Sequence, residues 1–453
     1  MSEPGARRES RFDACLRRDL TLPGGRRISV GVAVVAGLLA IGVCIRVAWS
    51  LLRDGHGATG EAFNVARAIA EGRGFADAFR VGQGPTAHLL PISPGIAGGV
   101  YRLFGVHSPA AESILTAWAL MLMLGTYLLL FRLFGRLGVS RWARLGGLAY
   151  LCLSPVYIAQ EAVDFRIWEG GLAVCLAVIL LSALVAAERV ERISAARTAG
   201  LAVLAAALFF VNPIIGVAGY AGTLIFAWRR FGMSQFVLAG LMAAAALAAF
   251  AAPWALRNAS QLDAFVPLRS NAGLELALGQ NPHAVDGADR GEVFRRRLAE
   301  IHPAVGSEAY RRLTAIGGEV PYSQALGRET RNWIADHPGD AARLTLRHIR
   351  QTLAPEPWQF GNGFLPELRA ILANLSGLLG LAGLALALSG RRPLWIYVAL
   401  MVLVPAIVMS PFQPISRYTY LFYPWLTFCA AYLVDRIVSA RFPARGQIAE
   451  NAS

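Results

Sequence analysis

The chain has 453 residues, of which 55% are hydrophobic and 16% are charged, whereas a soluble domain has about 25% charged residues. Its net charge is +14, and because the chain has no lysine, every basic residue is an arginine. These features exclude a Schiff-base lysine and a P-loop lysine for a nucleotide phosphate. The arginines stand mostly at the ends of apolar segments, which indicates orientation in a membrane and argues against nucleic-acid binding.

The first part of the chain predicts a tail, a membrane helix and an outer loop. Residues 1–29 are polar and rich in arginine, so we expect a cytoplasmic tail. The apolar segment 30–51 is too long for the core of a signal peptide, which indicates a retained first membrane helix. The polar segment 53–90 then lies outside, and its pattern GEAFNVARAIAEG predicts a short amphipathic helix that ends at Gly72 and Gly74.

Apolar segments continue along the chain at 89–105, 109–131, 143–162, 165–187, 199–229, 234–256, 369–389, 393–410 and 417–437. Two topologies fit them. In the first, 87–105 crosses the membrane and 199–229, broken at Asn212-Pro213, is one span. In the second, 87–105 is re-entrant and 199–229 is a pair of helices, which also keeps the arginines at 132–144 inside. Both give about ten spans with the C-terminal tail 438–453 in the cytoplasm, and the residues alone do not decide between them.

A polar segment of 112 residues, 257–368, separates the two groups of apolar segments. It has 13 arginines and 13 acidic residues, so the rest of the chain carries the whole positive charge. A neutral exported loop between basic cytoplasmic ends accounts for this division. We therefore expect an all-α, polytopic membrane protein with an N-terminal module 30–256, a helical periplasmic loop 257–368 and C-terminal membrane helices 369–437.

The cysteines and histidines do not form any motif typical of a metal or cofactor site. The two polar loops contain none of the five cysteines, so disulfides are not expected. We expect neither a metal nor another cofactor.

Two motifs of the first outer region can be interpreted either as functional or as purely structural. Asp54, Glu61 and Asp77 stand near a membrane boundary, where a partly desolvated carboxylate can act as a general base, but they also suit an ordinary solvated loop. The stretch GPTAHLLPISPGIAGGVYRLFG has a proline-rich start and a face of small residues, which are also typical of a helix cap and a close-packed helix.

Read in order, these two motifs resemble the first external loop and second helix of membrane glycosyltransferases of the protein O-mannosyltransferase and aminoarabinose-transferase type, which is the GT-C, family 39-like group. The match falls on Glu61, on Gly72-Arg73-Gly74-Phe75 and on Gly84-Pro85-Thr86-Ala87. His88 stands where an aromatic residue is common in that family. Later matches, which extend the resemblance over about 50–440, are IWEGGLAVCLAVILL, APWALRN, PLRSNAGLELALGQNP, His302-Pro303, His337-Pro338 and SRYTYLFYP.

The resemblance implies the GT-C fold, the first of the two topologies and a specific reaction. An inverting glycosyltransferase would move a hexosyl or pentosyl group from a polyprenyl-phosphate donor to a cell-envelope acceptor, which is a lipid, a glycan or a protein. The reaction would take place at the outer face of a bacterial-type inner membrane. It needs cations for the phosphate and a carboxylate for the acceptor, but no nucleotide.

The candidate site follows from these requirements. The resemblance makes Glu61 the expected base, with Asp54 and Asp77 in reserve. Asp164 and Glu169 are second candidates because acidic residues near span ends are often functional, although Glu169 also suits a helix N-terminus. For the phosphate we expect Arg269 and Arg417; Arg417 also suits an interfacial anchor beside aromatic residues. Tyr418, His88 and His302 complete the expected substrate-binding residues.

Other classes of membrane protein remain open. A transporter or lipid flippase would usually show internal repeats, and none is found. A polysaccharide polymerase or ligase would rely on arginine and histidine of the long loop, and a scaffold with a lost active site would need none of these residues.

Overall fold

The computed structural model describes residues 16, 19–21, 27–52, 59–287 and 289–441. Most of the predicted cytoplasmic tails, and Asp54, lie outside the described residues. Apart from a hairpin of two short antiparallel strands, β1 (Asp19–Thr21) and β2 (Arg27–Ser29), the described chain is helical. The predicted all-α class is therefore confirmed.

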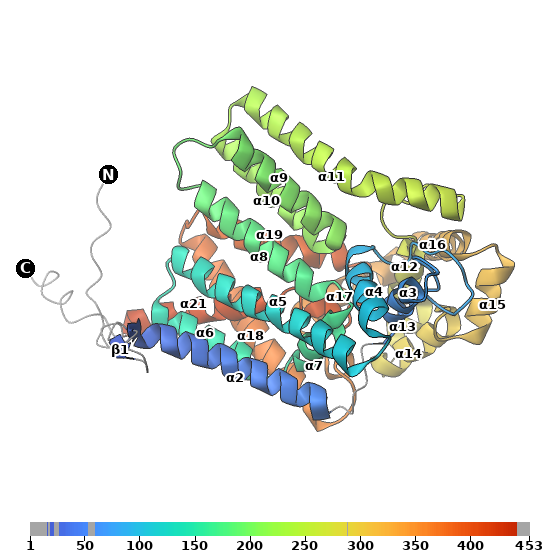
Figure 1. Cartoon of the computed structure of the whole chain (residues 1–453), viewed down its shortest axis with the longest axis horizontal. Helices are drawn as coiled ribbons and strands as arrows, with labels where there is room; N and C mark the ends of the chain where they lie inside the picture. The colour runs from blue at the N-terminus through green and yellow to red at the C-terminus, as the bar shows by residue number, and fades with distance from the viewer. Residues whose placement is uncertain (1–15, 17–18, 22–26, 53–58, 288, 442–453) are drawn as a thin grey trace, which may run out of the picture.

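Long helices lie side by side through the body of the molecule (Figure 1). In chain order they are α2 (Val30–Leu52), α5 (Pro109–Arg136), α6 (Arg141–Leu153), α8 (Gly170–Ala187), α9 (Ala195–Val211), α10 (Pro213–Arg230), α11 (Met233–Leu262), α18 (Phe364–Ser389), α19 (Trp395–Met409) and α21 (Tyr423–Arg441). By length and composition, α2, α5, α8, α11 and α18 suffice to cross a membrane, and α9 and α19 are shorter apolar helices. The number of ten spans stays a prediction.

The region 199–229 forms a helical pair. α9 ends and α10 begins at Asn212-Pro213, where the Asn212 side chain accepts a hydrogen bond from the Ile215 backbone. The two helices pack so closely that a Cβ on Gly216 would lie 2.3 Å from the Cα of Phe209. This is the arrangement of the second topology, and not the single broken span that the family resemblance implied.

Helix α4 (Ile92–Phe104) packs against α3 (Glu61–Ala70), where a Cβ on Gly98 would meet the side chain of Ile69 at 2.7 Å. With 13 residues, α4 is about 20 Å long at 1.5 Å per residue, which is too short for a hydrocarbon core of about 30 Å. Because α6 has the same length of 13 residues, whether α4 crosses the membrane stays a prediction.

The predicted segment 143–162 is not one helix. α6 ends at Leu153 because Pro155 forces Ser154 into an extended conformation, with ψ at 136°. The chain then forms α7 (Ile158–Ala162) and the short 3₁₀ helix η1 (Asp164–Arg166). This break places Asp164 and the following Trp168-Glu169 at the end of the helical bundle.

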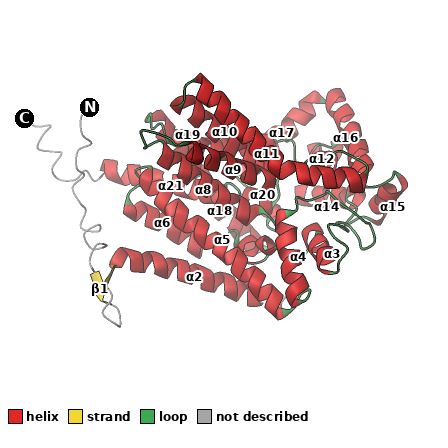
Figure 2. Ribbon diagram, turned by 45° about the horizontal axis from the view of Figure 1, so that its top comes forward, coloured by secondary structure: helices red, strands yellow, loops and turns green. Residues whose placement is uncertain are grey.

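The remaining helices gather with α3 and α4 at the end of the bundle that lies away from β1 (Figures 1 and 2). They are α12 (Ala272–Gly279), α13 (Pro282–Asp286), α14 (Arg290–Ile301), α15 (Ser307–Ala315), α16 (Glu319–Asp336), α17 (Pro338–Leu353), η2 (Pro357–Gln359) and α20 (Ser416–Thr419). Both predicted outer loops therefore meet at one end, although α11 and α21 continue past the predicted boundaries at 256 and 437.

Candidate active site

Glu61 is the first residue of α3, directly after Gly60, whose φ of 94° lies in the region that glycine adopts most easily. The helix buries Ala62, Val65 and Ala66, and it packs against α4. The Glu61 side chain is largely shielded, with 16% exposed. A carboxylate at a helix N-terminus is also favoured by the helix dipole.

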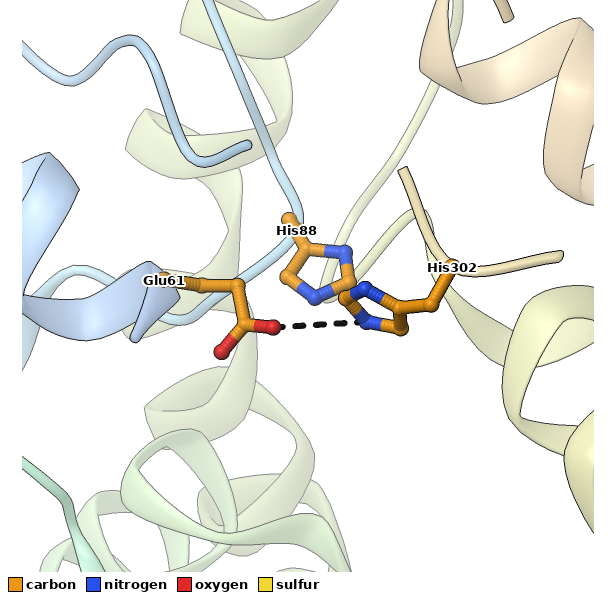
Figure 3. A group of neighbouring side chains, drawn as sticks. All are labelled: Glu61, His88 and His302. Carbon is orange, nitrogen blue, oxygen red and sulfur yellow. Dashed lines mark ion pairs between the residues drawn. The ribbon is translucent and has the colours of Figure 1, made fainter. Parts of the chain in front are cut away.

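His88 and His302 lie next to Glu61 (Figure 3). His302 follows α14, and its Nε2 is 3.3 Å from Oε1 of Glu61. His88 comes from the loop before α4, and its ring lies 5.9 Å from that of His302, with Phe79 against both rings. The structure therefore brings together three of the predicted site residues from separate parts of the chain.

The electrostatics of this cluster favour a charged carboxylate and neutral imidazoles. Burial alone would raise the pKa of Glu61, but His302, His88 and Arg417 together hold that pKa below its ordinary value. Burial lowers the pKa of His88 to about 3, and it also lowers the pKa of His302. Near neutral pH, Glu61 is ionised and both imidazole rings are neutral.

Glu319, at the start of α16, holds the GPTA segment against the long loop. Its carboxylate accepts hydrogen bonds from Thr86 Oγ1 and Ala87 N, both at 2.6 Å, and from Ser270 Oγ at 2.9 Å. Burial raises the pKa of Glu319 in spite of these bonds. No motif in the sequence points to Glu319, although Glu319 holds the backbone that precedes His88.

Two partly buried arginines lie on the other side of the site. Arg269 donates to Glu169, with Nη2 and Oε1 2.5 Å apart, while its buried Nε has no hydrogen-bond partner among the described residues. Arg417, on α20, stacks on Trp168 with its Cζ 3.7 Å from the ring centroid. The structure gives Arg417 no ion pair with any carboxylate of the described residues, although its charge acts on Glu61, Asp164 and Glu169. Both arginines therefore have hydrogen-bonding capacity to spare.

A groove of about 220 Å³ opens beside Arg269. Its polar lining includes Arg269, Asn271, Glu275 and Tyr418, and its apolar lining includes Pro213, Ile214, Leu268, Met409 and Phe412. An apolar groove with a cationic end suits a ligand that has a lipid part and an anionic head.

Glu275 is a carboxyl group of the site that the sequence analysis did not name. Burial and the nearby charge of Glu61 raise its pKa to about 6, although Arg269 and Arg417 act in the opposite direction. Asn271 donates to its Oε1 at 3.1 Å. Glu275 lies in the segment PLRSNAGLELALGQNP, which matches the family's long loop, and its only signal in the sequence is an acidic residue within an apolar stretch.

The other predicted acids differ in their surroundings. Burial raises the pKa of Asp164, which the charge of Arg417 only partly offsets. Asp77 is buried, and its carboxylate accepts from Gly84 N at 3.0 Å and Arg73 Nε at 2.7 Å. With φ at 61°, Asp77 closes the turn before GPTA, which is a structural role.

No protein-family model matches the chain, and no curated protein matches it in sequence. Solved structures do match. The archaeal oligosaccharyltransferase AglB from Archaeoglobus fulgidus, in complex with an inhibitory peptide and a dolichol-phosphate, has a TM-score of 0.52 at 14% identity, over 93% of this chain and 52% of its own. Its complex with zinc and sulfate has a TM-score of 0.51 at 13% identity, over 90% of this chain and 49% of its own.

A third structure, ArnT from Cupriavidus metallidurans bound to undecaprenyl phosphate, covers 91% of this chain and 79% of its own at 14% identity, but its TM-score is only 0.32. The chain spans about half the length of the oligosaccharyltransferase. At these identities the likeness concerns the fold, and at that level it confirms the resemblance found in the sequence. The chain has the fold of the GT-C membrane glycosyltransferases.

Proposed function

We propose that the chain is an inverting glycosyltransferase that moves a sugar from a polyprenyl-phosphate donor to a cell-envelope acceptor at the outer face of the inner membrane. The observation that carries this proposal is the pair of partly buried guanidinium groups, Arg269 and Arg417, near the Glu61 carboxylate, with Arg269 lining a largely apolar groove.

The two arginines suit the phosphate of such a donor. A buried guanidinium group without a full set of partners is costly, and a phosphate oxygen supplies charge-assisted hydrogen bonds that remove this cost. Arg269 has a free Nε, and Arg417 is held flat against Trp168. The apolar residues of the groove would then contact the first isoprenoid units of the carrier.

Glu61 suits the acceptor. It is ionised near neutral pH and faces the same region as Arg417, whose charge contributes to the lowering of its pKa. In a single displacement, Glu61 would accept the proton of the acceptor hydroxyl or amine while the acceptor attacks the sugar carbon. The donor phosphate would leave with the electron pair of the broken bond, stabilised by the two arginines.

Donor binding tests the proposal directly. The full chain in lipid nanodiscs would be titrated with a polyprenyl phosphate, and the same titration repeated with Arg417→Gln and Arg269→Gln. We expect each substitution to weaken binding at least about tenfold, the loss of roughly one charge-assisted contact. Arg343→Gln is the matched control, because Arg343 is 60% exposed on α17 and pairs with Asp340.

Arg417→Lys separates charge from geometry, since it keeps the charge but cannot bind bidentately or stack in the same way. It should bind with intermediate affinity. If Arg417→Gln and Arg269→Gln both bind the lipid phosphate as tightly as the unmodified chain, the donor site is elsewhere and the proposal is wrong.

A further inference from the structure

Glu61, His88 and His302 come from three separate segments and point their side chains at one another (Figure 3). One carboxylate oxygen and one ring nitrogen from each histidine all lie within 4.8 Å of one another. We propose that this cluster binds one divalent transition-metal ion of the zinc type and thereby joins the first outer loop to the long loop. The proposal rests on this chain's own side chains and does not depend on the proposed glycosyl transfer.

The donor set decides which metals suit the site. Two imidazole nitrogens and one carboxylate oxygen favour zinc and its first-row neighbours, whereas magnesium and calcium prefer oxygen ligands alone. Three protein ligands leave a fourth position of a tetrahedral ion for water or substrate. A metal ion binds the neutral form of imidazole and the ionised form of a carboxyl group.

The spacing of the ligand atoms is already close to that of a tetrahedral zinc site. With bonds of about 2.0–2.1 Å, neighbouring ligand atoms lie about 3.4 Å apart. Oε1 of Glu61 and Nε2 of His302 are 3.3 Å apart. Because all three ligand atoms lie within 4.8 Å of one another, the His88 ring completes the site by an approach on the order of 1 Å.

Nearby charges bear on the site in both directions. Arg417 and Arg269 act on the cluster and oppose a bound cation. Arg269 is paired with Glu169, and the carboxyl group of Glu275 lies close enough for the charge of Glu61 to shift its pKa. Because Arg269 is already paired with Glu169, part of this opposing charge is neutralised.

The simpler alternative is a hydrogen-bonded pair without metal. Nδ1 of His302 accepts from the backbone N–H of Ala304 at 3.3 Å, which places the ring proton on Nε2, facing Glu61. A metal on Nε2 would move this proton to Nδ1. The contact with Ala304 would then be lost, and it is already at the long end of the hydrogen-bond range.

Metal ligation also leaves part of Glu61 free. Oε1 faces His302, whereas Oε2 points away from the two rings (Figure 3). A monodentate carboxylate can bind the ion through Oε1 and still present Oε2 to an acceptor. The metal site and the proposed role of Glu61 are therefore compatible.

The experiment uses the full chain in detergent, with an affinity tag that has no histidine, after a chelator has removed bound metal. Zinc would be titrated calorimetrically, and the metal content measured after dialysis. We expect one high-affinity zinc per chain. His88→Ala and His302→Ala should each weaken zinc binding at least about tenfold. Loss of a residue that only hydrogen-bonds a metal ligand already lowers metal affinity about 10–100-fold. His283→Ala is the matched control, because His283 is an exposed histidine of the same long loop.

Cobalt provides a readout that needs no variant. Co²⁺ bound by nitrogen and oxygen in a tetrahedral site has strong visible absorption, which a surface-bound, hydrated ion does not have. The proposal is overturned if the unmodified chain gives no such absorption, or if His88→Ala and His302→Ala bind zinc as tightly as His283→Ala. Either result would leave the donor-binding experiment with Arg417→Gln unaffected, so the two proposals fail separately.

Discussion

At the scale of single residues, the chemistry of the site depends on burial that the sequence does not display. Glu61, Glu169, Arg269 and Arg417 were named from motifs, and the structure places them around one region. Glu275 and Glu319 were missed because neither has a motif of its own, and only the packing of α12 and α16 removes them from water. A motif can indicate the role of a residue, whereas a shift in its pKa depends on neighbours that are distant in the sequence.

Glu61→Gln keeps the size of the side chain but removes its charge and its proton acceptor. Loss of a positioned base commonly lowers the rate about 10²–10⁴-fold, and we expect a loss in this range with donor binding retained. The measurement is sugar transfer by purified protein from a polyprenyl-phosphate donor. Glu308→Gln is the control, since Glu308 is 72% exposed on α15. Retention of more than about a tenth of the activity would contradict the role of a base.

Glu275 predicts a pH dependence of stability. Its pKa in the folded protein, about 6, lies above the ordinary value of 4.5. The protonated form therefore favours folding, and this contribution is complete below about pH 4.5 and is lost as the pH rises through about 6. We expect Glu275→Gln, which cannot ionise, to raise the melting temperature at pH 7.5 but not at pH 4.5.

The check on Glu275 is the melting temperature of the ligand-free protein across this pH range. Glu308→Gln should change the melting temperature by the same amount at pH 4.5 and at pH 7.5. A difference between Glu275→Gln and the unmodified chain that does not vary with pH would show that the carboxyl group is not the source.

At the scale of elements, apolar length predicted most helices, but the breaks between them depended on particular residues. Pro155 ends α6, and Asn212-Pro213 separates α9 from α10. The hydropathy of segment 143–162 does not show the first break, because the residues after Pro155 are equally apolar. Because of this break, α7 and η1 place Asp164 at the site. A buried ion pair holds α7 in this position.

That ion pair joins Arg46 of α2 to Glu161 of α7, with both side chains 1% exposed. Arg46 also donates to the carbonyls of Leu151 and Cys152, and Tyr127 donates to Glu161. Removing one partner leaves a buried charge without compensation, so we expect Glu161→Gln or Arg46→Met to destabilise the protein by about 3–5 kcal/mol.

A double-mutant cycle checks this prediction. Arg46→Met combined with Glu161→Leu replaces both charges by apolar groups, and it should cost clearly less than the sum of the single changes. Unfolding of the detergent-solubilised protein would be followed by circular dichroism. Additive costs would show that the two side chains do not stabilise each other.

At the scale of the whole molecule, the meeting of the two polar loops at one end of the bundle is what assembles the site. Charge balance predicted that 53–90 and 257–368 share one face, and the structure places their helices together (Figure 1). The sequence does not decide which of the two topologies brings these loops together, because a long broken span and a helical pair have the same hydropathy. The close packing of Gly216 on Phe209 shows the helical pair, whereas the path of α4 through the membrane stays a prediction.

The topology can be tested with single cysteines in a chain whose native cysteines are replaced by serine. Ser307 is exposed in the long loop, and Arg192 is exposed between α8 and α9. If α9 and α10 are a pair of spans and α4 does not cross, then Ser307→Cys lies outside and Arg192→Cys lies in the cytoplasm. An impermeant thiol reagent should therefore label Ser307→Cys in intact cells, but Arg192→Cys only after the inner membrane is opened.

Labelling of both in intact cells would support the first topology, in which α4 crosses, and would leave the site outside. Labelling of Ser307→Cys only after opening would put Glu61, Arg269 and Arg417 on the cytoplasmic face, and transfer at the outer face would then be impossible.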